Sequence, residues 1–270
     1  DTRPLQASAQ QRPSGGFLRV GSFSGPAGVG LGGDILVHAD GAADLPTGQG
    51  VFLLSDRQLS KAGLSALTLQ TSGGVTFGAG SQLTLADGGK LTVDAGRTIN
   101  FDGTVIARSG AVSARTYELA GTIYRSALAA TGSVFTTADD VKFAYAAGEA
   151  LPGLFDINVN GTLDVSGLWS NDFLSVNTLP TGQAFNSGGA ISLTVAPKVL
   201  VAEGSDVESA KYAADLSGSI RLAKDALLNV SSGGYVDAAG ALVLTARGGS
   251  VSLINATTYA SLSQTPGVID

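Results

Sequence analysis

The chain has 270 residues, of which 44% are hydrophobic, 14% are charged and 38 are glycine, so it has ample apolar material for a core and many turns. Its formal net charge of −6 opposes binding to nucleic acid or to an anionic membrane surface. The absence of cysteine excludes disulfides and thiolate metal sites, and no apolar run approaches the roughly 18 residues of a membrane-spanning helix, so we expect no membrane insertion.

The N-terminal segment, residues 1–16, is polar and unlike the apolar centre of a signal peptide. Because the chain also lacks methionine, we expect a processed product or a piece of a longer protein. The first predicted strands follow at Phe17–Val20 and Asp34–His38, with a glycine-rich stretch between them.

Two short helices are predicted from capping boxes, in which a serine precedes the helix and a glutamine or glutamate follows three residues later. Ser55 and Gln58 predict a helix at Asp56–Ala62. Ser205 begins the same pattern before a predicted helix at Asp206–Leu216. Glycine follows each segment closely, as is common at helix C-termini.

Short apolar–polar–apolar triplets separated by turn residues recur through the rest of the chain. Three begin eight residues apart and five follow near the C-terminus: Leu83-Thr84-Leu85, Leu91-Thr92-Val93, Ile99-Asn100-Phe101, Ile220-Arg221-Leu222, Leu228-Asn229-Val230, Tyr235-Val236-Asp237, Leu242-Val243-Leu244 and Val251-Ser252-Leu253. Each triplet predicts a strand with two side chains on one face and one on the other. Strands this short need neighbours to be stable.

Parallel stacking of such strands about 4.8 Å apart buries a continuous apolar column, if two or three strands make one coil of roughly 20 to 25 residues. The sequence therefore predicts an all-β fold over residues 17–270, a right-handed parallel β-helix (β-solenoid) of about ten coils. The alternative is a β-sandwich or closed barrel, for which Asn160-Gly161 and three Asp-Gly pairs offer hairpin turns.

Three segments break this rhythm and are predicted to be excursions from the coils, at about residues 125–152, 166–189 and 203–217. The second contains the chain's single tryptophan. Insertions into repeat proteins map to loops that often form the binding face. We therefore expect specific contacts in the excursions rather than in the triplets.

The segment Gly161–Asp172, followed by Gly188–Leu193, resembles parts of very large bacterial exoproteins of the filamentous haemagglutinin type. The tracts Gly89–Gly110 and Leu216–Ile254 resemble the coil repeats of that family. The lack of cysteine agrees with the resemblance, which covers most of the chain from about residue 64 onward.

Proteins of this family are typically exported by two-partner secretion, form long right-handed β-helices and serve as adhesins or as stalks of contact-dependent toxins. The resemblance implies a secreted or cell-surface location and an outer-membrane secretion partner for the parent protein. It also implies adhesion to host or matrix glycans or to surface proteins. No cell-binding or toxin motif can be transferred, and Arg-Gly-Asp does not occur.

The sequence gives little support for a catalytic function. The single histidine, His38, lies in a predicted strand, where a polar structural role is expected rather than that of a general base. The nearest approach to the acid and base of a polysaccharide-cleaving β-helix is a group of five aspartates, Asp139, Asp140, Asp156, Asp164 and Asp172. Because aspartate often caps turns, we expect a non-enzymatic protein without cofactor or metal. A polysaccharide lyase or hydrolase remains the alternative.

Aromatic residues of the second excursion are the candidate ligand-binding residues. Trp169, Phe173 and Phe185 can each present an apolar face to a sugar ring. The alternative is a hydrophobic lid, in which the same side chains cover the stacked coils. Trp169→Ala separates the two interpretations: we expect a folded variant with reduced glycan affinity if the residue binds ligand, and an unfolded variant if it forms a lid.

Overall fold

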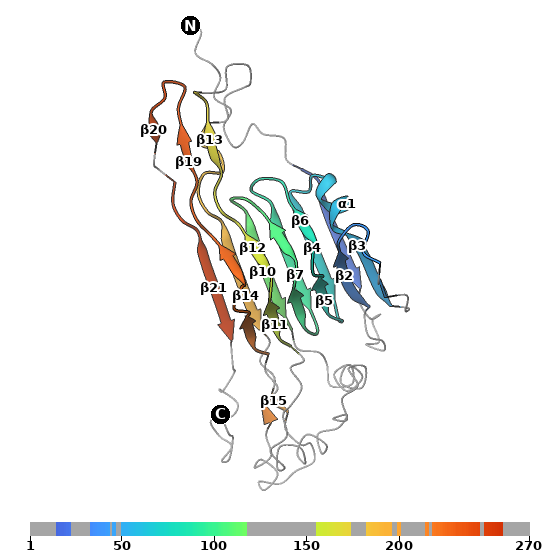
Figure 1. The fold of residues 1–270 in the computed structure, drawn as a ribbon. Coiled ribbons are helices and arrows are strands. Elements are labelled where there is room, and N and C mark those ends of the chain that lie inside the picture. The colour runs from blue at the N-terminus through green and yellow to red at the C-terminus, as the bar shows by residue number, and fades with distance from the viewer. Residues whose placement is uncertain are drawn as a thin grey trace.

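The structure is a computed structural model, and it describes residues 15–22, 33–43, 45–46, 50–117, 155–173, 182–195, 199–200, 214–215, 218–243 and 246–255. Within these residues the chain forms twenty-one strands and one short helix (Figure 1), which confirms the predicted all-β class. Most of the N-terminal segment and the excursion predicted at 125–152 lie outside the described residues, as does the excursion at 203–217 apart from Ala214–Asp215.

Sheet A contains six strands, each parallel to its neighbours. In order across the sheet they are β1 (Phe17–Ser22), β4 (Ala66–Thr71), β7 (Lys90–Ala95), β10 (Ala111–Thr116), β14 (Ala190–Val195) and β21 (Ser250–Asn255). Leu91, for example, pairs with Leu67 on one side and with Val112 on the other. Because a shift of one residue would turn every side chain to the opposite face, this constant register keeps one apolar face inward.

Sheets B and C repeat the arrangement with shorter strands. Sheet B runs β3 (Val51–Ser55), β2 (Asp34–His38), β5 (Val75–Phe77), β8 (Ile99–Phe101), β11 (Ile157–Val159) and β17 (Ile220–Leu222). Sheet C runs β6 (Gln82–Thr84), β9 (Thr104–Ile106), β12 (Thr162–Asp164) and β18 (Leu227–Asn229). All pairs in both sheets are parallel, whereas the hairpins of a sandwich would give antiparallel pairs.

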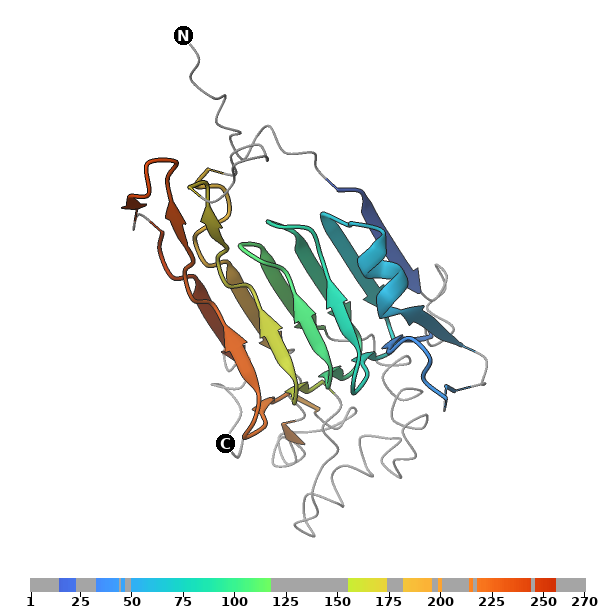
Figure 2. The same ribbon diagram turned by 45° about the horizontal axis from the view of Figure 1, so that its top comes forward.

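From β4 to β18 the chain visits sheets A, B and C in turn, and we call one such visit a rung (Figure 2). β4, β7 and β10 begin at residues 66, 90 and 111, so the rungs between them are 24 and 21 residues long, as the triplet spacing predicts. Connections within a rung vary: residues 96–98 join β7 to β8, but residues 117–156 join β10 to β11. Sheet A has six described strands, fewer than the ten or so coils that the sequence predicts.

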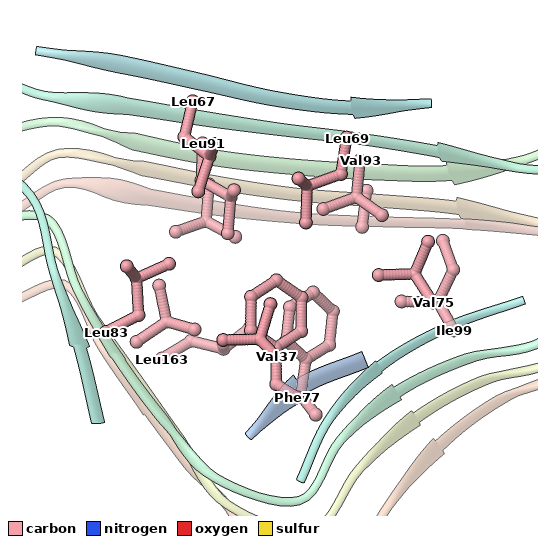
Figure 3. Close-up of a cluster of buried hydrophobic side chains, with 14 of the residues drawn as sticks. Val37, Leu67, Leu69, Val75, Phe77, Leu83, Leu91, Val93, Ile99 and Leu163 are labelled. Atoms are coloured by element: carbon pink, nitrogen blue, oxygen red, sulfur yellow. The ribbon is translucent and has the colours of Figure 1, made fainter. Parts of the chain in front are cut away.

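Inward side chains of all three sheets meet in one hydrophobic core (Figure 3). Leu67, Leu91 and Leu83 are among the residues with no exposed surface. Phe77 and Phe101, on adjacent strands of sheet B, stack with ring centroids 4.9 Å apart and planes 13° from parallel. The same residue position in each rung therefore contributes to the same apolar column, which is how short strands acquire stability together.

The helix predicted after Ser55 is confirmed as α1 (Asp56–Lys61). The Ser55 hydroxyl accepts a hydrogen bond from the Gln58 backbone N–H at 3.3 Å, as an N-cap does. α1 lies beside β6, at the place that a sheet C strand occupies in later rungs, and Leu59 joins the core. The second predicted helix, at residues 206–216, is wrong at its C-terminal end.

There, Ala214–Asp215 form strand β16, which pairs antiparallel with β15 (Val199–Leu200). Pairing with another segment satisfies the backbone groups that a helix would have satisfied internally. The rest of that predicted helix lies outside the described residues.

A glycine precedes each of the last four strands of sheet A, and these glycines stack on one another. A Cβ on Gly110 would lie 1.9 Å from the carbonyl oxygen of Gly89, and one on Gly189 would lie 1.9 Å from that of Gly110. Gly249 repeats the contact, with 1.8 Å to the Gly189 oxygen. Rungs approach so closely at this corner that no side chain fits between them.

We predict that Gly110→Ala lowers the free energy of unfolding by about 2–3 kcal/mol, because the added methyl forces neighbouring rungs apart. Gly16→Ala is the matched control: a Cβ there meets nothing within 4 Å, so its effect should stay within about 1 kcal/mol. Urea unfolding of the two variants provides the measurement. Equal stability of both would contradict the stacked-glycine interpretation.

Candidate functional site

The excursion predicted at residues 166–189 contains a strand, β13 (Trp169–Asn171), that starts a small additional sheet. In this sheet, sheet D, β13 pairs parallel with β19 (Gly234–Val236), which pairs antiparallel with β20 (Leu242–Val243). Figure 1 shows the three strands together beyond the ends of β12 and β14. Sheet D thus extends the later rungs beyond the shared core.

One side of sheet D is apolar and exposed. The side chain of Trp169 is 67% exposed, that of Phe173 56% and that of Leu242 55%. Val236 lies opposite Leu242 in the β19–β20 pair and is half-buried. We call the surface formed by Trp169, Asn171, Phe173, Val236 and Leu242 the sheet D face. The exposure of both rings favours the ligand-binding interpretation of Trp169 and Phe173 over the hydrophobic lid.

Both exposed rings rest on glycines of the neighbouring hairpin. A Cβ on Gly234, the partner of Trp169 in the strand pair, would lie 2.4 Å from Cζ3 of the indole. A Cβ on Gly240, which has a φ of +83°, would lie 3.3 Å from Cδ2 of Phe173. The glycines let the rings lie against the backbone, which fixes the direction in which their other surfaces face solvent.

The opposite side of sheet D is polar and buried. The Tyr235 hydroxyl donates a hydrogen bond to Oδ2 of Asp172 at 2.9 Å, and the Gly182 N–H donates to the same oxygen at 2.9 Å. The Asn186 amide donates to the backbone oxygens of Leu168 at 2.7 Å and of Gly234 at 2.6 Å. These bonds tie the segment around residues 182–186 to the underside of sheet D and hold the exposed face in place.

Phe185 lies apart from the other two predicted ligand-binding residues. Its ring packs against Gly88, in the turn before β7, where a Cβ would be 2.5 Å from Cε1 of Phe185. Its backbone has a φ of +63°, and its carbonyl accepts a hydrogen bond from the Leu168 N–H at 2.7 Å. The structure therefore brings Trp169 and Phe173 together on sheet D and assigns Phe185 to packing between rungs.

The described aspartates of the predicted acid–base group hold backbone turns. Asp156 is 2% exposed and accepts a hydrogen bond from the Ser219 N–H at 2.7 Å. Asp164 accepts from the Ser166 N–H at 2.9 Å and forms an ion pair with Arg108 at 2.9 Å. Together with Asp172 beneath sheet D, each serves as an acceptor within the fold. Residues 139–140 lie outside the described residues.

His38 ends β2 in an outward, half-buried position, with Nδ1 2.9 Å from the Ala39 carbonyl oxygen. Asp34, at the other end of β2, accepts a hydrogen bond from the Gly74 N–H at 2.7 Å. Across the described ranges, no three His, Cys, Asp or Glu side chains gather closely enough to hold a metal ion.

Sequence reasoning missed the residues that orient the aromatic rings. Gly234 and Tyr235 belong to a triplet region and were expected to be ordinary strand residues, and Asn186 carried no signal at all. Their roles depend on the pairing of β13 with β19, which lie one rung apart in space but 65 residues apart in sequence (169 to 234). A glycine facing a tryptophan across two strands is visible only once that register is known.

No protein-family model, curated protein or solved structure matches this chain. Among the residues described, no helix has both the length and the apolar character needed to cross a bilayer. The geometry of sheet D and of the stacked rungs is therefore the basis on which function is inferred.

We predict that the Tyr235–Asp172 hydrogen bond makes stability pH-dependent at alkaline pH. Burial, followed by donation to Asp172, raises the pKa of Tyr235 above its ordinary value. The stabilisation of the folded state by protonated Tyr235 is thus complete below the unfolded-state pKa of about 10. It is lost as pH rises through the higher folded-state pKa.

Tyr235→Phe should therefore lower the free energy of unfolding by about 1 kcal/mol near neutral pH, because Asp172 loses one donor. Urea unfolding at about pH 8 and about pH 11 tests this, since the gap between wild type and variant should shrink at the higher pH. A gap that is independent of pH would contradict the prediction.

Proposed function

We propose that this chain is a non-enzymatic segment of a secreted or surface-displayed bacterial exoprotein of the filamentous haemagglutinin type. In this proposal the three sheets are the faces of a right-handed parallel β-helix that acts as a rigid rod. The sheet D face binds host or matrix glycans, and an outer-membrane secretion partner exports the parent protein.

Parallel pairing in constant register supports the rod. Each rung is joined to the next by backbone hydrogen bonds in three sheets, and each adds one layer to the same core. Such a stack lengthens by about 4.8 Å per rung without changing its cross-section. A structure of this kind suits a protein that must hold a binding surface away from a cell.

The exposed aromatic side chains of sheet D are the observation that carries the proposed glycan binding. Large aromatic residues are usually well buried, yet Trp169 and Phe173 are more than half exposed on a hydrogen-bonded sheet. One part of each ring packs against glycine and the other is presented to solvent. A fixed aromatic surface can stack on the apolar face of a sugar ring without first losing conformational entropy.

The hydrogen-bonded state of the aspartates supports a non-enzymatic role over the lyase or hydrolase alternative. A glycosidase needs two carboxyl groups that face a sugar-binding cleft, one as acid and one as base or nucleophile. Asp156 and Asp164 are largely buried and accept hydrogen bonds from backbone N–H groups of the fold. Their geometry suits turn formation.

We predict that Trp169→Ala and Phe173→Ala each weaken glycan binding at least about tenfold, equivalent to about 1.4 kcal/mol, because each removes an exposed stacking surface. A glycan array, followed by titration with the best ligand, measures the loss. Circular dichroism and urea unfolding should show an unchanged fold, since neither side chain belongs to the buried core.

Two further variants sharpen the test. Phe17→Ala removes another exposed aromatic, 85% exposed on β1 and outside sheet D, and should leave binding unchanged. Gly234→Ala keeps both rings but displaces the indole and should weaken binding. Unaltered binding by Trp169→Ala, or the absence of any bound glycan, would contradict the proposed glycan binding. The chain would then be a spacer or the stalk of a contact-dependent toxin.

A further inference from the structure

The β21 end of the stack, formed by β17 and β21, leaves inward apolar side chains uncovered. Val251 and Leu253 of β21 are 41% and 45% exposed. Their partners in the preceding rung, Ile191 and Leu193, occupy the same inward positions and are 1% and 0% exposed. The difference arises because, among the residues that the structure describes, no strand stacks on β21 as β21 stacks on β14.

Sheet B shows the same feature at this end. Leu222 of β17 is 45% exposed, whereas its partner Val159 in β11 is fully buried. Within the described part of the chain, no strand pairs with the outer edge of either β17 or β21. Unpaired edges of parallel sheets above an apolar core are a ready surface for a further strand.

The β1 end, formed by β1 and β3, is open in the same two sheets. β1 is the outermost strand of sheet A and β3 that of sheet B, each with one unpaired edge among the described residues. Their inward positions are again apolar: Leu18 and Val20 on β1 are half-buried, and Phe52 on β3 is 44% exposed.

We propose that the β21 end docks head to tail on the β1 end of a second copy of this chain, continuing sheets A and B across the junction. The register of the existing pairs assigns the contacts. In sheet A, Val251 and Leu253 would lie beside Leu18 and Val20 of the second copy. In sheet B, Leu222 would lie beside Leu54 of the second copy.

Two features favour this occupant. Val251 and Leu253 of β21 meet apolar inward positions of β1, and Ile220 and Leu222 of β17 meet those of β3, so both the backbone pairing and the core continue. Asn255, the third inward position of β21, is polar. The two ends also match in how far sheets A and B extend. Sheet A extends one strand beyond sheet B at the β21 end, because β21 follows β17 in the chain, and sheet B extends one strand beyond sheet A at the β1 end, where β3 is added outside β2.

Sheet C does not take part, because α1 occupies the place of a strand beside β6. The contact joins two different surfaces and is therefore heterologous. Such a contact does not close on itself and produces linear chains of molecules. The second copy would thus lengthen the rod along its own axis.

The test is the association state of the purified chain. Between about 1 and 100 µM, sedimentation velocity should show stepwise growth, and electron microscopy should show rods of constant width and increasing length. The double variant Val251→Lys/Leu253→Lys should abolish growth. Ile254→Lys is the matched control on the same strand, since Ile254 is 43% exposed and alternates to the outward face, and it should still associate.

Phe52→Lys blocks the opposite end and should also be monomeric alone. A mixture of Phe52→Lys with Val251→Lys/Leu253→Lys restores one good junction and should give a one-to-one dimer that grows no further. Circular dichroism checks that each variant is folded.

A wild-type chain that stays monomeric at the highest concentration would overturn the proposal. Failure of the two folded variants to combine would also overturn it, because each variant keeps intact one of the two ends that the proposed junction joins. Neither outcome depends on glycan binding, so this test and that of the sheet D face are independent.

Discussion

Parallel backbone pairing in a fixed register is the constraint on which the rest of this structure depends. A residue in one rung meets the equivalent residue in the next. Each inward apolar position therefore belongs to a column of apolar side chains that runs through the core. The same constraint forces glycine at the corner before β10, β14 and β21, where successive backbones touch. Core, turns and surface therefore all repeat because the register does.

Sheet D depends on that pairing as well. β13 and β19 meet only because their rungs are adjacent, and their contact brings Trp169 onto Gly234 and Tyr235 onto Asp172. An exposed aromatic surface thus lies above a polar, hydrogen-bonded layer. The hydrogen bonds of this layer fix the backbone of the strands that carry the exposed side chains.

The sequence predicted the local elements well. Triplets with period-two alternation became strands, and Ser55 with Gln58 marked the start of α1. The all-β class follows from these alone, since few segments have the length or periodicity of a helix. Strand pairing depends on segments that are far apart in the sequence. The pairing that forms sheet D could therefore not be predicted from local sequence patterns. Trp169 and Phe173 were identified as candidates, but their exposure and the separation of Phe185 follow from long-range register.

Connections between strands of one rung range from residues 102–103 to residues 117–156, yet the strands that they join keep the same register. The pairing of the strands thus fixes where each connection begins and ends, but it does not limit the length of the connection. Such an architecture can acquire, lose or exchange whole segments at these points while its core stays unchanged. The stretch between β10 and β11 is accordingly a natural place for divergence between relatives and for grafting a foreign domain onto the rod.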